Sequence, residues 1–194
     1  VKAELLSALG AACYYALLPG SQIQLSEEVR AETLDIAAQH LQDKDTRKAS
    51  RGADVVGKLL EQNGLKPEMT GKYLTMLRDR YAALISDNKD SPLRLDLLKV
   101  MRRLSETGPQ RAVAAGLYGP LFSESIKDGQ PAIREVALAG LEAIDKTQAL
   151  AAVRQFDLAN DAAIAVRSQA VKLAGSVGQT QDLDWLSPRL GAAG

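Results

Sequence analysis

Apolar residues recur along this chain with the spacing of an α-helix, and this periodicity constrains the fold more than any other feature. Between residues 92 and 105, for example, Leu97, Leu98, Met101 and Leu104 fall on one side of a helix. No run of alternating polar and apolar residues, which would indicate a half-buried strand, stands out in the sequence. The pattern therefore predicts a fold built from helices.

Proline and glycine separate the periodic stretches. Proline is tolerated in the first turn of a helix and disrupts a helix interior, so these residues mark boundaries. We expect an all-α protein with helices near 2–18, 26–42, 46–63, 67–86, 92–105, 109–118, 131–145, 147–158, 162–177 and 181–190. Composition agrees, since hydrophobic residues make up 46% and aromatics only 4%, which favours aliphatic contacts between closely packed helices.

The stretch RGADVVGKLL, residues 51–60, contains the G-x-x-x-x-G-K spacing of a phosphate-binding loop. Such a loop follows a buried strand and carries Ser or Thr after its lysine. Here the preceding residues are strongly polar, and Leu59 follows Lys58. We therefore predict a continuous helix, in which Gly52 and Gly57 allow another helix to approach closely.

A seven-residue pattern comes at the start of three of the expected helices. It places an acid, or Asn in its stead, six residues before an arginine: NKDSPLR at 88–94, DGQPAIR at 128–134 and DAAIAVR at 161–167. Apolar residues follow each arginine at positions +3, +4, +7 and +10. Successive arginines are 40 and 33 residues apart, a spacing found in helical repeats.

This pattern resembles the D-x-x-P-x-V-R signature of HEAT repeats and of their relatives of the bilin-lyase type. The resemblance covers residues 88–190 well and weakens upstream, where QLSEEVR at 24–30 keeps only Val-Arg. It implies one α-solenoid of stacked antiparallel helix pairs over residues 1–194. Residues 1–87 would then form irregular or degenerate repeats, and residues 88–194 clearer ones.

The resemblance also implies that the acids and arginines form a ladder between neighbouring repeats. Its expected members are Asn88, Arg94, Asp128, Arg134, Asp161 and Arg167. Each acid lies just ahead of a helix, where a carboxylate can also cap free backbone N–H groups. We expect this structural role for the arginines rather than a row of ligand-binding side chains.

The charges of the chain balance, with 24 Lys and Arg against 24 Asp and Glu. This balance argues against an obligate partner of strong negative charge, such as nucleic acid or an anionic membrane.

The single cysteine, Cys13, excludes an internal disulfide, and we expect it to be buried. The single histidine, His40, excludes a His-rich metal site and falls at the end of an expected helix. We therefore expect no metal and no cofactor.

No apolar run approaches the roughly 20 residues that a membrane-spanning helix needs. Residues 5–18 could pass for the apolar part of a signal peptide, but Lys2 and Glu4 give that stretch a mixed charged flank, and we read it as a helix.

Because the chain begins at Val1 rather than Met, we expect upstream residues to be missing and the chain to belong to a longer protein. A cytoplasmic location is slightly favoured.

These features point to a non-enzymatic scaffold that binds a protein or peptide on an extended surface formed by the second helices of successive pairs. The candidate partner surface consists of Tyr14, Tyr15, Lys99, Arg102 and Arg103. The carboxylates are spaced as on a solvated helix face, so no catalytic residue is assigned. Partner identity and oligomeric state stay open.

Two other functions are compatible with the sequence. One is a nucleic-acid-binding solenoid, similar to the HEAT-like DNA glycosylases, with Arg94, Lys99, Arg102 and Arg103 as phosphate contacts. The other is a chromophore-handling protein of the bilin-lyase type, which the repeat resemblance alone suggests.

Overall fold

The computed structural model describes residues 2–16, 18, 20–22, 26–62, 67–86 and 92–191. These residues form ten α-helices and one short 3-10 helix, with no strand among them, so the prediction of an all-α protein is confirmed. The elements are α1 (Lys2–Ala16), α2 (Glu27–Leu41), α3 (Thr46–Leu60), α4 (Pro67–Ser86), α5 (Pro92–Glu106), α6 (Arg111–Ser125), α7 (Pro131–Ile144), α8 (Lys146–Gln155), η1 (Leu158–Asn160), α9 (Ile164–Val177) and α10 (Thr180–Gly191). None of the helices in the described part has the length and apolar character needed to cross a membrane.

The starts of the helices follow directly from local sequence. The Ser26 hydroxyl accepts a hydrogen bond from the backbone N–H of Val29 at the start of α2. Asp45 and Asp145 accept in the same way from backbone N–H groups at the starts of α3 and α8. Proline is the first residue of α4, α5 and α7, where its missing N–H costs no hydrogen bond.

Helix α6 extends beyond its expected end. The sequence predicts a helix over 109–118, because a proline normally stops a helix, yet Pro120 lies inside α6. The apolar spacing continues across the proline: Ala114, Tyr118 and Phe122 are four residues apart and fully buried. Burial of each of the two aromatic side chains, Tyr118 and Phe122, contributes about 1.5–3 kcal/mol, so together they offset the roughly 3 kcal/mol cost of the proline.

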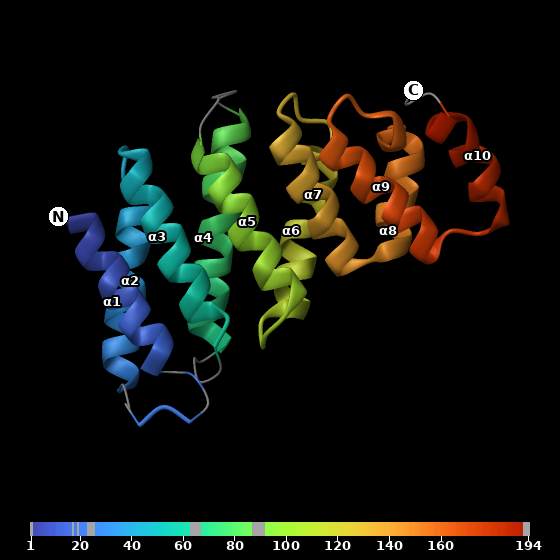
Figure 1. The fold of residues 1–194 in the computed structure, drawn as a ribbon. Helices are drawn as coiled ribbons and strands as arrows, with labels where there is room; N and C mark the ends of the chain where they lie inside the picture. Colours follow the sequence, from blue (N-terminus) through green and yellow to red (C-terminus); the bar gives the residue numbers. More distant parts are fainter. Residues whose placement is uncertain are drawn as a thin grey trace. The chain divides into compact units, whose positions relative to one another are not determined.

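The chain divides into two compact units, residues 1–118 and 119–194. In the first unit, α1, α3 and α5 lie side by side in one layer, with α2 and α4 in a second layer behind them (Figure 1). In the second unit, α7 and α9 pack side by side and run in the same direction, with α8 behind (Figure 1). That the whole chain forms one α-solenoid with an irregular first part, 1–87, stays a prediction.

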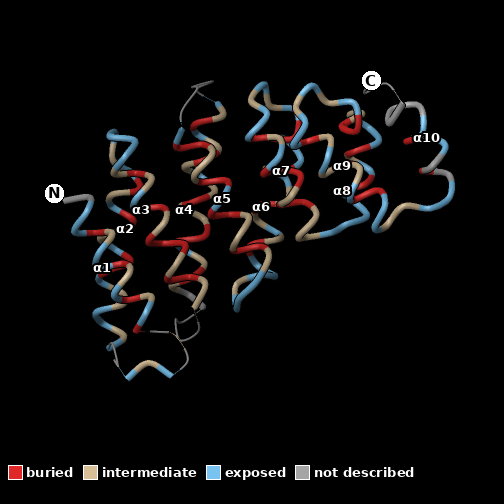
Figure 2. The backbone as a smooth tube through the Cα atoms, viewed as in Figure 1, coloured by how far each residue is buried: buried red, intermediate tan, exposed pale blue. Residues whose placement is uncertain are grey.

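Buried residues line the sides on which neighbouring helices of each unit meet (Figure 2). Helix α3 has two such sides, and a glycine lies on each. A Cβ at Gly52 would lie 2.5 Å from the carbonyl oxygen of Ala37 and from the backbone nitrogen of Leu41, and a Cβ at Gly57 would lie 2.6 Å from Cγ1 of Val100. The two glycines therefore bring α2 and α5 close to α3, as the sequence predicts. The phosphate-loop spacing falls inside one continuous helix.

Candidate functional site

The acid and arginine of the repeat pattern meet across successive repeats in the second unit. Arg134, in the first turn of α7, donates from Nη2 to Oδ1 of Asp161 at 2.6 Å and from Nε to Oδ2 at 2.8 Å. The two side chains are only 14% and 8% exposed. A two-pronged, charge-assisted contact of this kind is both strong and directional, so it ties α7 to the turn that precedes α9.

The electrostatics of this pair favour its ionised form. Burial alone would raise the pKa of Asp161, but hydrogen bonds from Arg134 and from the backbone N–H of Ala163, together with the charges of Arg134 and Arg167, lower the pKa overall. The hydrogen bond with Asp161 raises the pKa of Arg134. A carboxylate held so firmly in its ionised form suits a structural anchor rather than a proton donor.

Each arginine also secures the turn in its own repeat. Nη1 of Arg134 donates to the carbonyl oxygen of Asp128 at 2.8 Å, and Nη1 of Arg167 donates to that of Asp161 at 2.6 Å. The carboxylates of Asp128 and Asp161 accept from the backbone N–H two residues further on. This corrects the expectation that they cap the helices: the bonded N–H belongs to the residue just before α7 or α9 begins, so each acid shapes the preceding turn.

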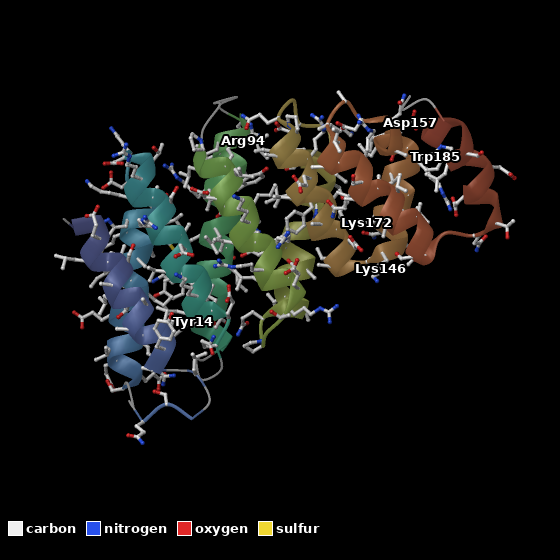
Figure 3. The ribbon with its side chains drawn as sticks, viewed as in Figure 1. Tyr14, Arg94, Lys146, Asp157, Lys172 and Trp185 are labelled. Carbon is white, nitrogen blue, oxygen red and sulfur yellow. The ribbon has the colours of Figure 1, made fainter. Side chains whose placement is uncertain are left out.

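The remaining expected ladder members belong to the first unit. Asn88 lies outside the described residues. Arg94, in the first turn of α5, is buried with 7% of its surface exposed (Figure 3). Its burial removes Arg94 from the set of cations that could reach a phosphate in solution.

A second arginine–aspartate pair, which the repeat pattern does not predict, links α8 to α10. Nε of Arg154 donates to Oδ1 of Asp182 at 2.7 Å, while Oδ2 of Asp182 accepts from the backbone N–H of Gln179 at 2.6 Å. The available signal was an acid in the first turn of an expected helix, which does not by itself identify its partner.

The main candidate site is a groove of about 1230 Å³ that α1, α3 and α5 form in the first unit. Its volume exceeds the roughly 300–1,000 Å³ of small-molecule pockets, and most of its lining residues are charged. The basic residues are Arg47, Lys48, Arg51, Lys99 and Arg103, and the acidic residues are Glu4, Asp45, Asp54 and Asp96. The groove therefore suits a polar chain better than an apolar small molecule.

The aspartates of the groove are engaged by the protein itself. Asp45 accepts hydrogen bonds from two backbone N–H groups at the start of α3. Asp54 forms an ion pair with Lys58 at 2.8 Å, one helical turn further on. Asp96 of α5 accepts from the Ser50 hydroxyl of α3 at 2.6 Å, a contact that joins the two walls of the groove.

The cations of the groove are less fully engaged. Within the described residues, the side chains of Arg47 and Lys99 form no ion pair or hydrogen bond, and both are exposed. Arg51 is exposed and interacts electrostatically with Glu4. The groove thus presents more available positive charge than negative charge to a ligand. The sequence signal for this feature was three basic residues within the first two turns of α3.

The structure brings together only part of the expected partner surface. Lys99 and Arg103 both line the groove, and Arg103 lies between Asp54 at 3.5 Å and Glu61 at 2.9 Å. Arg102 instead pairs with Glu106 on its own helix at 3.0 Å. This difference follows from helical geometry, because adjacent residues on a helix point about 100° apart.

The two tyrosines of the expected surface lie near the end of α1, outside the groove lining. Tyr15 is 64% exposed. The ring of Tyr14 (Figure 3) contacts that of Tyr15 edge-on, with centroids 5.7 Å apart. They form a small aromatic patch separate from the charged groove.

The other residues with potential chemistry lie in less open surroundings. Cys13 is buried as expected, and its Sγ lies 3.5 Å from Oγ1 of Thr33. His40, in the last turn of α2, lines an apolar hollow of about 240 Å³ beside Leu5 and Leu9. This hollow is smaller than typical ligand pockets. In the part of the chain that the structure describes, no three His, Cys, Asp or Glu side chains are grouped to hold a metal ion.

Comparison of the chain with protein-family models, with curated proteins and with solved structures gives no match.

Proposed function

We propose that this protein is a HEAT-like helical-repeat scaffold that binds a segment of a partner polypeptide in the groove of α1, α3 and α5. The observation that carries the proposal is the groove itself: a large, charged hollow formed by three helices of one layer. Helices positioned by close packing provide a preformed surface, and a preformed surface lowers the entropy cost of binding.

The contacts between the walls support a rigid groove. A Cβ at Gly10 of α1 would overlap Cγ2 of Val55 on α3, and Gly57 of α3 similarly faces Val100 of α5. Because each contact leaves no space for a larger side chain, the three helices stay in register. Charged side chains along the groove, together with Ser50, offer hydrogen bonds to both side chains and backbone of an extended segment.

Binding rather than catalysis is the function that this lining supports best. Among the residues that the structure describes, those that line the groove include no histidine and no cysteine. Its aspartates hold backbone groups, a lysine and a hydroxyl, so they stabilise the walls of the groove. A general acid–base site needs a titratable group that lies within hydrogen-bond reach of a substrate and whose pKa is close to the working pH.

The alternatives have less support. Of the four cations expected to contact phosphates, Arg94 is buried and Arg102 is paired with Glu106. A chromophore needs a mainly apolar pocket, whereas this groove is lined mostly by charged residues. The polypeptide scaffold therefore accounts for more of the geometry than either alternative does.

A selection from a library of random peptides tests the proposal. The intact chain is the bait, and enriched peptides are then measured against Lys99→Glu, which reverses a charge in the groove. Lys172→Glu makes the same change at an exposed position on α9 in the other unit (Figure 3). We expect the enriched peptides to bind Lys99→Glu at least about fivefold more weakly than the natural chain, a difference of roughly 1 kcal/mol. Their affinity for Lys172→Glu should be unchanged. Failure to enrich any peptide that depends on the groove would refute the proposal.

A further inference from the structure

We infer that the groove of α1, α3 and α5 selects an acidic, extended segment of its partner; this inference rests on the proposed function. The argument starts from an imbalance between the two kinds of charge that line the groove. Numbers alone do not show it, because basic and acidic residues are nearly equal in the lining. The imbalance lies in what each group already contacts.

The negative charges are largely occupied. Asp54 lies between Lys58 at 2.8 Å and Arg103 at 3.5 Å, and Asp96 accepts a short hydrogen bond from Ser50. Asp45 is held by the backbone at the start of α3. A basic ligand would have to compete with these contacts for each carboxylate.

The positive charges include groups that face no such competition. Arg47 and Lys99 have no ion pair or hydrogen bond from their side chains within the described residues, and Arg51 has only its interaction with Glu4. All three are exposed and line the groove. A carboxylate of a ligand can therefore pair with them without breaking a contact, and in a groove such pairs are screened less than on an open surface.

The positions of the three cations predict the spacing of the acids. Arg47 and Arg51 lie one turn apart on α3, a rise of about 6 Å, and Lys99 lies on the adjacent helix α5, about 8–10 Å away. An extended chain advances about 3.3 Å per residue. Acids two or three residues apart in the partner would meet successive cations, and this spacing defines the expected sequence of the segment.

An acidic polypeptide fits this groove better than a nucleic acid. Phosphates follow one another at every nucleotide, so a strand that reaches all three cations also passes the carboxylates of Asp54 and Asp96. A peptide can place neutral residues opposite those two carboxylates. The interleaved charges therefore favour a ligand whose negative charges are spaced apart.

The test uses labelled peptides of about 12 residues, long enough to span about 40 Å when extended. One peptide has Glu at every third position in a Gly and Ser background, and two others have Lys or Gln at the same positions. A single-stranded oligothymidylate of matched length is the fourth probe. Fluorescence anisotropy at low salt measures the affinity of each probe for the intact chain. We expect the Glu peptide to bind at least about fivefold more tightly than the Lys and Gln peptides, and to weaken as salt is added.

Substitutions then locate the binding. Arg51→Gln and Lys99→Gln should each weaken the Glu peptide by about two- to fivefold, the effect expected for one exposed ion pair. Lys146→Gln and Lys172→Gln remove the same charge from exposed positions on α8 and α9, both labelled in Figure 3, and should have no effect. Circular dichroism confirms that each variant keeps its helices.

Several outcomes would overturn the inference: equal or tighter binding of the Lys or Gln peptide, tighter binding of the oligothymidylate through the same cations, or no binding of the Glu peptide. None of them would refute the proposed function, which fails only if random peptides show no binding that depends on the groove. Peptides of basic or neutral composition enriched through the groove would leave the scaffold function in place and refute its preference for acids.

Discussion

Arg134 in α7 holds Asp161, 27 residues further along the chain, with both nitrogens of one edge of its guanidinium group. The same carboxylate accepts from the backbone of its own turn, and that turn is also held by Arg167. One buried acid thus connects the start of α7 with the start of α9.

Removal of the arginine from this pair should destabilise the protein. Arg134→Ala leaves the carboxylate of Asp161 without its charge-assisted partner, so we expect the free energy of unfolding to fall by about 1–3 kcal/mol. Chemical denaturation of Arg134→Ala, Asp161→Ala and the double variant gives the coupling between the two residues. An unchanged midpoint in Arg134→Ala would show that the contact does not contribute to stability.

The pair should also make stability depend on pH in the acid range. The pKa of Asp161 in the folded protein is lowered, below the value of about 3.9 in an unfolded chain. Its stabilising contribution is therefore present above about pH 4 and is lost as the pH falls through the folded pKa. In Arg134→Ala the backbone N–H of Ala163 and the charge of Arg167 still act on the carboxylate, but the arginine no longer opposes the effect of burial, so this loss should become smaller. Denaturation midpoints measured from pH 6 to pH 3 for the two proteins provide the comparison; parallel curves would contradict it.

Gly52→Ala should destabilise the first unit, although alanine is the better helix former. Its Cβ would lie 2.5 Å from backbone atoms of α2, which cannot rotate away as a side chain can. We expect a loss of about 1–3 kcal/mol from overpacking. Gly71→Ala in α4 is the matched control, because no atom of the described residues lies within 4 Å of a Cβ there, and it should raise stability by up to about 1 kcal/mol. Thermal unfolding of both variants separates the two effects, and equal shifts would rule out the close contact.

Mg-ATP and Mg-GTP should not bind through residues 52–58. These residues lie within α3, and the amine of Lys58 already pairs with Asp54 at 2.8 Å. A continuous helix has no free N–H groups in its interior with which to surround a phosphate. Calorimetry with each nucleotide should show no saturable heat. A heat that is present in the natural chain and absent from Lys58→Ala would mean that the segment can open into a loop.

The helices could be predicted from sequence because their signals are local. Apolar spacing, prolines at first positions and capping side chains all act within a few residues, and most expected boundaries lie within three residues of those observed. Pro120 is the exception, because burial of aromatics on both sides of it depends on neighbouring helices that a local pattern does not include. The close approaches at Gly52 and Gly57 were predictable from the lack of any other role for glycine inside a helix.

The groove could be predicted only in part. Lys99 is among the residues of the expected partner surface, whereas Arg47 and Arg51, which belong to a segment in which the repeat pattern is weak, are not. Which charged side chains of the groove are available to a ligand depends on contacts between helices. The hydrogen bond of Ser50 with Asp96, for example, connects residues 46 positions apart. Arg102 pairs with Glu106 on its own helix, whereas Arg103 lies in the groove. This difference likewise depends on the rotation of α5 against α3.

The packing of helices on near neighbours in the chain also has a kinetic consequence. The most extensive pairings in each unit, α2 with α3, α3 with α5 and α7 with α9, join helices that are adjacent or next but one in sequence. Short loops close at little entropic cost, and chains dominated by such local contacts fold in microseconds to milliseconds. Each unit should therefore collapse quickly once its own residues have left the ribosome, without waiting for the rest of the chain.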